Sequence, residues 1–344
     1  MSSADPNGSI CILPRLIGVG GPASFQGRLI SGLEARGIRA HFDPNDPTTR
    51  AVLMIGATRR VQWLIGPRRR GVRVVQRLNG MNWLHRKLPT GIKHWLRSEY
   101  NNWLLATTRR SLVDAVVYQS RFARNWWQTV YGAVRAPGRV VYNGVNLSLF
   151  TPEGPEERPG DHYRVLMVEG HMRGGYETGL ESGVRLVEEL NRILPRPVRL
   201  VVAGEVAPVL ARQWDSRARG MIEWAGIVAR ESVPALDRSA HVLFSADLNA
   251  ACPNSVVEAL ACGLPVVAFD TGALPELIQN DAGRVVPYGS NYWNLEPPDI
   301  PALAAAAAHI LTNQEHYRAA ARAHAAANFG LDAMVEQYLE ALLP

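Results

Sequence analysis

Short hydrophobic runs recur along the first half of the chain, and stretches with helical spacing lie between them. The runs are rich in β-branched residues, which is the pattern of strands buried on both faces of a sheet. We predict such strands at residues 9–13, 38–42, 51–57, 72–78 and 113–120. Phe25, Leu29 and Leu33 recur every four residues and predict a helix, for whose first turn Pro22 is well suited. This alternation indicates a parallel sheet with helices on both faces.

The second half repeats the alternation after a change in composition. Residues 151–161 are acidic and rich in Pro and Gly, which indicates a linker. Beyond it we predict a helix at 177–194 and strands at residues 162–170, 198–204, 241–246 and 264–269. The pattern predicts two doubly wound α/β domains, residues 1–150 and 151–330. An amphipathic helix at 331–343 could pack on either domain, so it could fold back onto the first.

Composition indicates a globular protein that builds a hydrophobic core. Hydrophobic residues make up 47% of the chain and charged residues 20%. The start of the sequence is polar, and no apolar run approaches the roughly 20 residues that a membrane-spanning helix needs. The cysteines, Cys11, Cys252 and Cys262, are scattered and odd in number, which is typical of the cytoplasm. They lack the spacing of zinc ligands, so no metal is predicted.

Charge differs sharply between the two halves. Residues 1–150 hold 22 of the 37 Lys and Arg residues but only 6 of the 31 Asp and Glu residues, a net charge of +16, whereas the remainder carries −10. A basic half indicates an anionic partner, which could be a phosphate-bearing substrate, an acidic membrane surface or nucleic acid. The alternative is a solvated basic face with ion pairs between the domains. Nucleic acid is the least favoured partner, because no recognition motif is present.

A segment in this basic half mixes aromatic and basic residues. Residues 83–105 interleave three tryptophans with Arg86, Lys87, Lys93 and Arg97, and residues 68–73 read RRRGVR. Amphipathic segments of this kind lie at membrane interfaces. The alternative is a helix that packs its aromatic side chains into the core. A lipid-phosphate or other anionic acceptor would fit the first interpretation.

Two loops could hold a nucleotide. Gly18-x-Gly20-x-x-Ala23, with Asp43 ending the second predicted strand, has the spacing of a dinucleotide fingerprint and would indicate an NAD(P)-dependent oxidoreductase. Four residues separate the first strand from Gly18, so a loop that lets the backbone approach a phosphate, or a plain turn, is the favoured interpretation.

The second loop opens the stretch CPNSVVEALACGLPVVAF, residues 252–269. Ser255 and Glu258 fit a capping box, which would explain both residues without a ligand. The start of this helix also lies where an anion such as a diphosphate would be favoured, and a carboxylate one turn later could accept hydrogen bonds from a ribose diol. Both roles stay open at this point.

Three segments carry a family resemblance. Residues 226–287, with their PNSVVEALACGLPVVA run, resemble the nucleotide-binding part of the GT4 family of retaining glycosyltransferases. Residues 140–152, VVYNGVNLSLFTP, resemble the linker of that family, and residues 116–124 its last N-terminal strand and serine turn. The resemblance implies the GT-B fold, in which two Rossmann-like domains face a central cleft. It also implies a nucleotide diphosphate sugar as donor, a glycan, lipid-phosphate or other small-molecule acceptor, and no metal cofactor.

The resemblance also implies roles for individual residues. Glu258 would bind the ribose hydroxyls of the donor, and Arg173, Glu258 and Asn79 would be the catalytic residues. Arg77, Asn79 and Gly80 would lie on the acceptor side. The nucleotide and donor would contact Gly20, Gly21, Gly170, His171, Glu205, Ile227, Val228, Arg230, Cys252, Pro253, Asn254, Ser255, Val256 and Glu258.

The chain departs from the family pattern at three places. The first glutamate of the Glu-x7-Glu motif falls at Ala250, where Asp247 is the nearest substitute. The usual Gly-Arg and Lys-Gly pairs appear as EGHMRGGY, residues 169–176, so Arg173 is favoured over His171 as the cation on the phosphates. A histidine common in the family is replaced by Asn79. The leading interpretation is a cytoplasmic glycosyltransferase that could lie at the inner face of a membrane. Because of these departures, a relative without catalytic activity is a further alternative.

Overall fold

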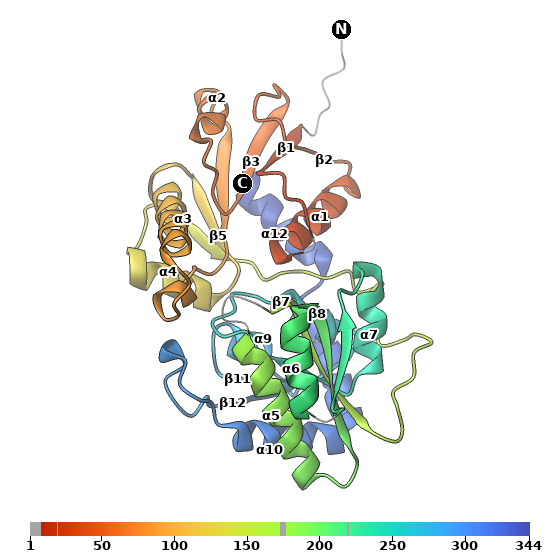
Figure 1. Cartoon of the computed structure of the whole chain (residues 1–344). Helices are drawn as coiled ribbons and strands as arrows, with labels where there is room; N and C mark the ends of the chain where they lie inside the picture. The colour runs from red at the N-terminus through yellow and green to blue at the C-terminus, as the bar shows by residue number, and fades with distance from the viewer. Residues whose placement is uncertain (1–7, 19, 173–176, 219) are drawn as a thin grey trace. The chain divides into compact units, whose positions relative to one another are not determined.

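The computed structural model describes residues 8–18, 20–172, 177–218 and 220–344. The chain forms two compact units, each a sheet covered by helices (Figure 1). The first unit contains the chain up to Gly144 together with Leu331–Pro344, and the second contains Val145–Gly330. The C-terminal segment therefore completes the unit in which the chain begins.

The first unit is built on a parallel sheet with strand order β2-β1-β3-β4-β5-β6. Its strands are β1 (Ser9–Leu13), β2 (Arg39–His41), β3 (Thr49–Ile55), β4 (Arg73–Leu78), β5 (Ala115–Tyr118) and β6 (Gly138–Val140). The five strands predicted for this half are confirmed, with ends that differ by at most two residues. β6 is absent from the predictions because its three residues are exposed or half-buried and form no hydrophobic run.

Helices cover both faces of this sheet. They are α1 (Gly21–Glu34), α2 (Ile65–Arg69), α3 (Ile92–Ser111), α4 (Arg121–Tyr131) and α12 (Leu331–Leu342). The blue α12 lies beside the red α1 in Figure 1. Gly32 permits this contact, because a Cβ atom there would lie 2.5 Å from Val335 Cγ2. The rings of Phe25 and Tyr338 pack 5.1 Å apart across the same contact.

The opposite face is covered by α2, α3 and α4. Trp127 of α4 is fully buried in a cluster with Leu78 and Tyr118 of the sheet. The tryptophans of α3 behave differently, since Trp95 is 43% exposed and Trp103 is 57% exposed. The alternative in which this segment packs its aromatic side chains into the core is therefore wrong for these two residues.

The second unit has a parallel sheet with strand order β12-β11-β10-β7-β8-β9. Its strands are β7 (Tyr163–Met172), β8 (Val198–Val206), β9 (Ile222–Gly226), β10 (Val242–Ser245), β11 (Val266–Phe269) and β12 (Gly283–Val286). The four predicted strands are confirmed. β9 and β12 are the edge strands, and they escaped prediction because most of their residues are only half-buried.

Helices also cover both faces of the second sheet. They are α5 (Glu177–Ile193), α6 (Pro208–Ala218), α7 (Val233–Ser239), α8 (Asn254–Ala261), α9 (Leu274–Leu277), α10 (Ile300–Thr312) and α11 (Gln314–Asn328). The predicted helix at 177–194 is confirmed as α5, and it packs on the Ala-rich α10. Within the described ranges, no helix is both long and apolar enough to cross a membrane.

Candidate active site

Parallel strands place the residues that follow them at one edge of the sheet. In the second unit, Gly170 and His171 lie near the end of β7, and Glu205 lies near the end of β8. The two strands pair so that His171 stands opposite Glu205. Gly170 and Glu205 are exposed. The structure therefore brings these three predicted residues together at the carboxyl edge of the sheet.

The next strand end places three further predicted residues. Ile227 and Val228 follow Gly226, whose φ of 65° turns the chain at the end of β9. Arg230 begins the short 3-10 helix Arg230–Ser232. Ile227 and Arg230 are exposed and Val228 is half-buried. An apolar side chain and a cation therefore lie at the surface of one loop.

The start of α8 differs from the predicted capping box. The helix begins at Asn254, and its N-cap is Pro253, with φ −68° and ψ 128°. Ser255 is therefore the second helical residue, and within the described chain no side chain caps the helix. The capping-box interpretation is wrong, because Ser255 lies inside the first turn, where its backbone is helical. Without a capping box, capping of α8 does not explain the presence of Glu258.

Glu258 lies on the buried side of α8 and is only 8% exposed. It is close enough to Asp237 of α7 for their charges to interact. Asp237 is 1% exposed, and burial raises its pKa well above the usual range, with the charge of Glu258 adding to the shift. This favours the neutral form of Asp237.

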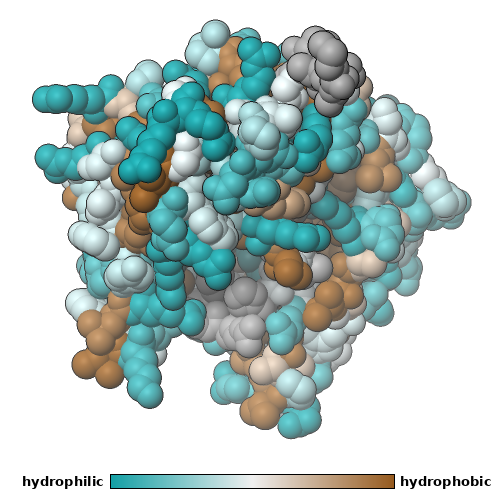
Figure 2. All heavy atoms as spheres, turned by 90° about the horizontal axis from the view of Figure 1, so that it is seen from above, coloured by the Kyte–Doolittle hydropathy of each residue, from teal (hydrophilic) through white to brown (hydrophobic). Residues whose placement is uncertain are grey.

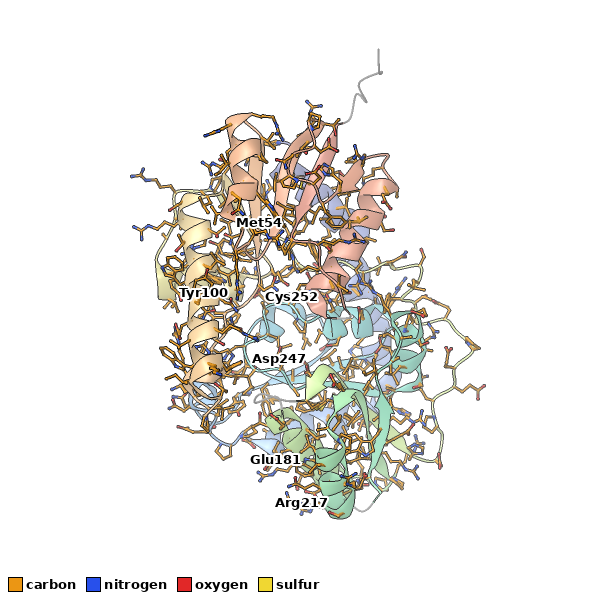
Figure 3. All side chains as sticks on the ribbon, turned by 45° about the horizontal axis from the view of Figure 1, so that its top comes forward. Met54, Tyr100, Glu181, Arg217, Asp247 and Cys252 are labelled. Atoms are coloured by element: carbon orange, nitrogen blue, oxygen red, sulfur yellow. The ribbon has the colours of Figure 1, made fainter. Side chains whose placement is uncertain are left out.

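A second pair of carboxyl groups lies near the ends of two adjacent strands. Glu169 is on β7 and Asp247 follows β10, and these strands pair directly (Figure 3 labels Asp247). Burial raises the pKa of Asp247 to about 7. Burial and the charge of Asp247 together raise the pKa of Glu169 well above its usual range. The pair therefore favours holding one proton near neutral pH.

The loop between β10 and α8 is tightly built around Ala250. Asn249 has φ 63°, and Gly272 has φ 59° and lies so close that a Cβ there would be 2.6 Å from Ala250 N. Ala273 N donates to Ala250 O at 2.8 Å. The side-chain nitrogen and oxygen of Asn249 and the hydroxyl of Thr271 are buried, with no hydrogen-bond partner in the part of the chain that the structure describes.

A small cavity opens beside this loop, with a volume of about 150 Å³. Ala246 and Leu248, which flank Asp247, contribute to its wall. Glu181 and Arg185 of α5, which form an ion pair at 2.7 Å, and Tyr288 also line it. Cys252, labelled in Figure 3, is buried a few residues further along the same loop.

Sequence reasoning did not single out Glu169, Asp237 or Asn249. An acidic residue close to the end of the predicted strand 162–170 was an available signal for Glu169. Nothing in the sequence distinguishes Asp237 from a surface acid of an amphipathic helix, because its burial depends on the packing of α7 against α8.

The glycines of the first unit lie at the start of α1. Gly20 is the N-cap, and Gly21 is the first helical residue. Both are exposed, and a Cβ at Gly20 would meet nothing within 4 Å. β1 ends at Leu13 and α1 begins at Gly21, and this separation is longer than the tight turn of a dinucleotide fingerprint. The loop geometry therefore does not favour the NAD(P) interpretation.

Arg77 and Asn79 lie at the end of β4. Arg77 is 1% exposed, and its guanidinium group stacks on Phe25 at 3.8 Å from the ring centre. It donates to Asn79 Oδ1 at 2.6 Å and to Asn143 Oδ1 at 2.9 Å. Asn79 and Gly80 are half-buried. The geometry therefore places Arg77 behind Asn79, where it fixes the orientation of the amide.

Other predicted residues lie on or near the loop before α8. Val256 is buried, whereas Pro253, Asn254 and Ser255 are half-buried. Arg173, the favoured cation for the phosphates, lies outside the described residues.

Comparison with known families gives two matches. Residues 171–313 match the family described as glycosyl transferases group 1, and residues 55–149 match glycosyltransferase family 4. Together the two matches cover more than half of the chain. The first match lies in the second unit, and the second match lies in the first unit apart from residues 145–149.

The chain also resembles individual proteins, each over less than half of its length. The chain is 31% identical over 178 residues to the GDP-mannose-dependent alpha-(1-6)-phosphatidylinositol dimannoside mannosyltransferase of Mycobacterium tuberculosis, which is 49% of this chain and 44% of that protein. It is 26% identical over 159 residues to a phosphatidylinositol N-acetylglucosaminyltransferase subunit of Arabidopsis thaliana, which is 44% of this chain and 34% of that protein. Each match thus spans less than half of the relative's length.

The fold is shared over nearly the whole chain with a solved structure. Sucrose-phosphate synthase from Thermosynechococcus elongatus superposes with a TM-score of 0.72 at 16% identity, covering 98% of this chain and 95% of that one. The likeness establishes the arrangement of sheets and helices.

Proposed function

The chain belongs to the group 1 glycosyltransferases of family 4 and has the GT-B fold, and from this premise we propose that it transfers a sugar with retention at the anomeric carbon. The proposed donor is a nucleoside diphosphate sugar. The observation that carries the proposal is Glu258, which is almost fully buried on a helix that begins at the carboxyl edge of the sheet without a side-chain cap in the described chain.

The chemistry of this edge suits a nucleotide. A carboxylate with several acceptor sites can take two hydrogen bonds from the hydroxyls of a ribose, and Glu258 is the carboxylate proposed for this role. The start of α8 favours an anion, which we assign to the diphosphate. Ile227 and Val228 are proposed to cover the base, with Arg230 beside it.

Departure of the nucleoside diphosphate needs stabilisation of negative charge. We propose that the start of α8 and Arg173 provide it, and that no metal cofactor takes part. Arg173 is preferred to His171 because a guanidinium stays charged at any physiological pH. A charge-assisted hydrogen bond of about 1.5–3 kcal/mol would account for one to two decades in rate.

The sugar of the donor would meet an altered motif. Ala250 replaces the glutamate that the family places there, and its side chain offers no hydrogen bond. Asp247 precedes it by three residues, and we propose that this carboxyl group binds sugar hydroxyls instead. With a pKa of about 7, Asp247 can donate or accept near neutral pH.

The acceptor is proposed to carry a phosphate or to be linked to a lipid. The net charge of +16 on residues 1–150 supports an anionic acceptor, and the names of both curated relatives refer to phosphatidylinositol compounds. Asn79 and Gly80 are proposed to contact this acceptor, and Arg77 to hold Asn79. We place the protein in the cytoplasm, at the inner face of a membrane, with no role in nucleic-acid binding.

A ligand screen tests the proposal. Thermal unfolding is measured with UDP-, GDP- and ADP-sugars and with NAD(P), for the wild type and for Glu258→Gln. Glu315→Gln, an exposed change on α11, serves as the matched control. One class of nucleotide sugar should raise the melting temperature of the wild type and of the control but not that of Glu258→Gln.

Two outcomes would change the conclusion. Stabilisation by NAD(P) alone would overturn the transferase proposal in favour of an oxidoreductase. Binding of a nucleotide sugar without hydrolysis or transfer would indicate a non-catalytic binding protein, the second candidate that Ala250 motivates.

A further inference from the structure

The first two turns of α3 project from the surface of the first unit. Residues 91–97 are all exposed, although they include three large apolar side chains. Ile92 is 76% exposed, Leu96 57% and Trp95 43%. A soluble monomer rarely leaves so many large apolar groups together in water, so this segment indicates a surface that is covered in use.

The exposed groups continue along one side of the helix. Tyr100 and Trp103 are exposed and follow Leu96 at spacings of four and three residues, which places them on one helical face. The other side of α3 anchors the helix, because Ser98, Asn102 and Ala106 are buried. Val130 of α4 is exposed and lies with Leu96 and Trp103 around a shallow hollow. Figure 3 labels Tyr100 on this helix.

Basic residues surround these apolar groups. Lys87, Lys93 and Arg97 are exposed, and the guanidinium of Arg59 lies over the ring of Tyr100 at 5.5 Å. The two lysines are the only ones in the chain. Seen from above, the surface in Figure 2 shows hydrophobic groups scattered between hydrophilic side chains.

The one acidic residue of α3, Glu99, is paired with neighbouring basic residues. Glu99 accepts hydrogen bonds from Arg86 at 2.5 and 2.8 Å and lies 2.7 Å from His85 Nε2. Arg86, and then His85, lowers the pKa of Glu99 to about 2. The remaining charge around the apolar groups is therefore positive.

We propose that this α3 face, formed by Ile92, Lys93, Trp95, Leu96, Arg97, Tyr100 and Trp103, docks on the surface of an anionic lipid bilayer. Its aliphatic and aromatic side chains enter the boundary between headgroups and acyl chains, where tryptophan and tyrosine are favoured. Its lysine and arginine extend to the lipid phosphates. The proposal does not depend on the transfer reaction.

The composition of the face favours a bilayer over other anionic partners. A nucleic acid would attract the basic groups but offers no apolar layer for Ile92 and Leu96. An acidic protein would need a groove that covers two helical turns on several sides, because residues 91–97 are all exposed. A lipid bilayer needs no such groove, because lipid molecules can surround the inserted end of a helix on all sides.

Flotation with vesicles tests the proposal on the whole chain. Vesicles of phosphatidylcholine alone are compared with vesicles that contain about one third phosphatidylglycerol. The wild type should bind the anionic vesicles at least about tenfold more tightly, and added salt should weaken this binding. Equal binding to both kinds of vesicle, or to neither, would overturn the proposal.

Two sets of variants separate the apolar from the basic contribution. Replacing Ile92, Trp95 and Leu96 by serine should lower vesicle binding more than tenfold, while Lys93→Gln with Arg97→Gln should lower it by a similar factor. The matched control is Val209→Ser with Arg212→Gln on α6, which removes an exposed apolar and an exposed basic group from the second unit. The control should bind within twofold of the wild type.

A soluble polyanion distinguishes a lipid surface from a general anion site. The serine variant should bind inorganic polyphosphate as the wild type does, because its basic residues are intact. Loss of both polyphosphate and vesicle binding would contradict insertion of the apolar groups.

The two lysines allow an independent readout. Anionic vesicles should lower amine-selective labelling of Lys87 and Lys93 severalfold in the wild type, and leave it unchanged in the serine variant. Labelling that stays the same in the vesicle-bound wild type would place the bilayer elsewhere and overturn the proposal.

Discussion

Arg77 donates a 2.6 Å hydrogen bond to Asn79 Oδ1 from a position that is almost completely buried. Asn79 is also bonded to its other neighbours, since Gln119 donates to the same oxygen at 2.5 Å and Trp127 Nε1 donates to the backbone carbonyl at 2.7 Å. Two donors therefore hold the side-chain amide of Asn79, and a third holds its backbone, which fixes how the amide is presented at the end of β4.

The buried guanidinium should contribute strongly to stability. Arg77→Met removes the donors to Asn79 and Asn143 and leaves their oxygens less well paired in the core. We expect the free energy of unfolding to fall by about 3 kcal/mol, measured by urea denaturation. Arg36→Met is the control, because Arg36 pairs with Asp332 and Glu336 near the surface and should cost less than about 1 kcal/mol. Equal losses would show that Arg77 has no special role.

Glu258 should matter for ligand binding far more than for stability. Since α8 has no capping box, Glu258→Gln should change the free energy of unfolding by less than about 1 kcal/mol. The affinity for the nucleotide should fall by about 10- to 100-fold, because charge-assisted hydrogen bonds to the ribose are weakened. Calorimetric titration with the nucleotide found in the screen measures this, and a large stability loss with unchanged affinity would contradict it.

Ser255→Ala tests the corrected helix start. A true N-cap serine would cost about 1 kcal/mol on replacement. With Pro253 as the N-cap and Ser255 inside the first turn, we expect a change below about 0.5 kcal/mol in urea denaturation. A loss as large as that of a true N-cap would restore the capping interpretation.

His241 should make the protein less stable in acid. Burial, followed by the charge of Arg158, lowers its pKa to about 3, and its Nδ1 accepts from Arg164 N at 3.0 Å. Between the unfolded pKa near 6.5 and about 3, the unfolded chain binds the proton more readily, so stability falls as pH falls. The slope from this group is at most about 1.4 kcal/mol per pH unit. In His241→Asn, which keeps an acceptor at the Nδ1 position, the contribution should vanish from unfolding free energies measured between about pH 4 and 7.

Asp247 should make the protein less stable as pH rises, in contrast to His241. Its pKa of about 7 in the folded state exceeds the unfolded value, so the folded chain holds the proton more tightly. The stability from this group is present below about pH 4 and is lost as pH rises through 7. Asp247→Asn mimics the neutral form and should therefore stabilise the protein at about pH 8 relative to the wild type. The advantage should shrink at about pH 5, and an advantage that does not depend on pH would contradict the raised pKa.

The strands that could be predicted are those with hydrophobic runs. β1, β3 and β11 lie inside their sheets and read directly as buried segments. The strands β6, β9 and β12 could not be recognised, because their residues are exposed or half-buried and form no hydrophobic run. The edge strand β2 was predicted. The parallel order itself followed from the alternation of strands and helices.

Site residues that follow strand ends could be predicted from the sequence, whereas the burial of the site's carboxyl groups could not. Glu258 and Ile227 were placed by the strand–loop pattern and the family resemblance. The N-cap of α8 is Pro253 and not Ser255, so Ser255 is a helical residue and does not cap the helix. The raised pKa values of Asp237 and Asp247 depend on packing between distant segments, which no local pattern carries.

Ala250→Glu tests whether this loop still accepts the family's usual residue. Ala250 is buried, and its backbone lies against Gly272, so a glutamate must either displace the loop or bury a charge. We expect a loss of about 2–4 kcal/mol in the free energy of unfolding and no gain in donor binding. Ala251→Glu, at the half-buried neighbouring position, should cost less than half as much. A stable Ala250→Glu variant with tighter donor binding would show instead that the loop retains the family's donor pocket and that Asp247 does not replace its glutamate.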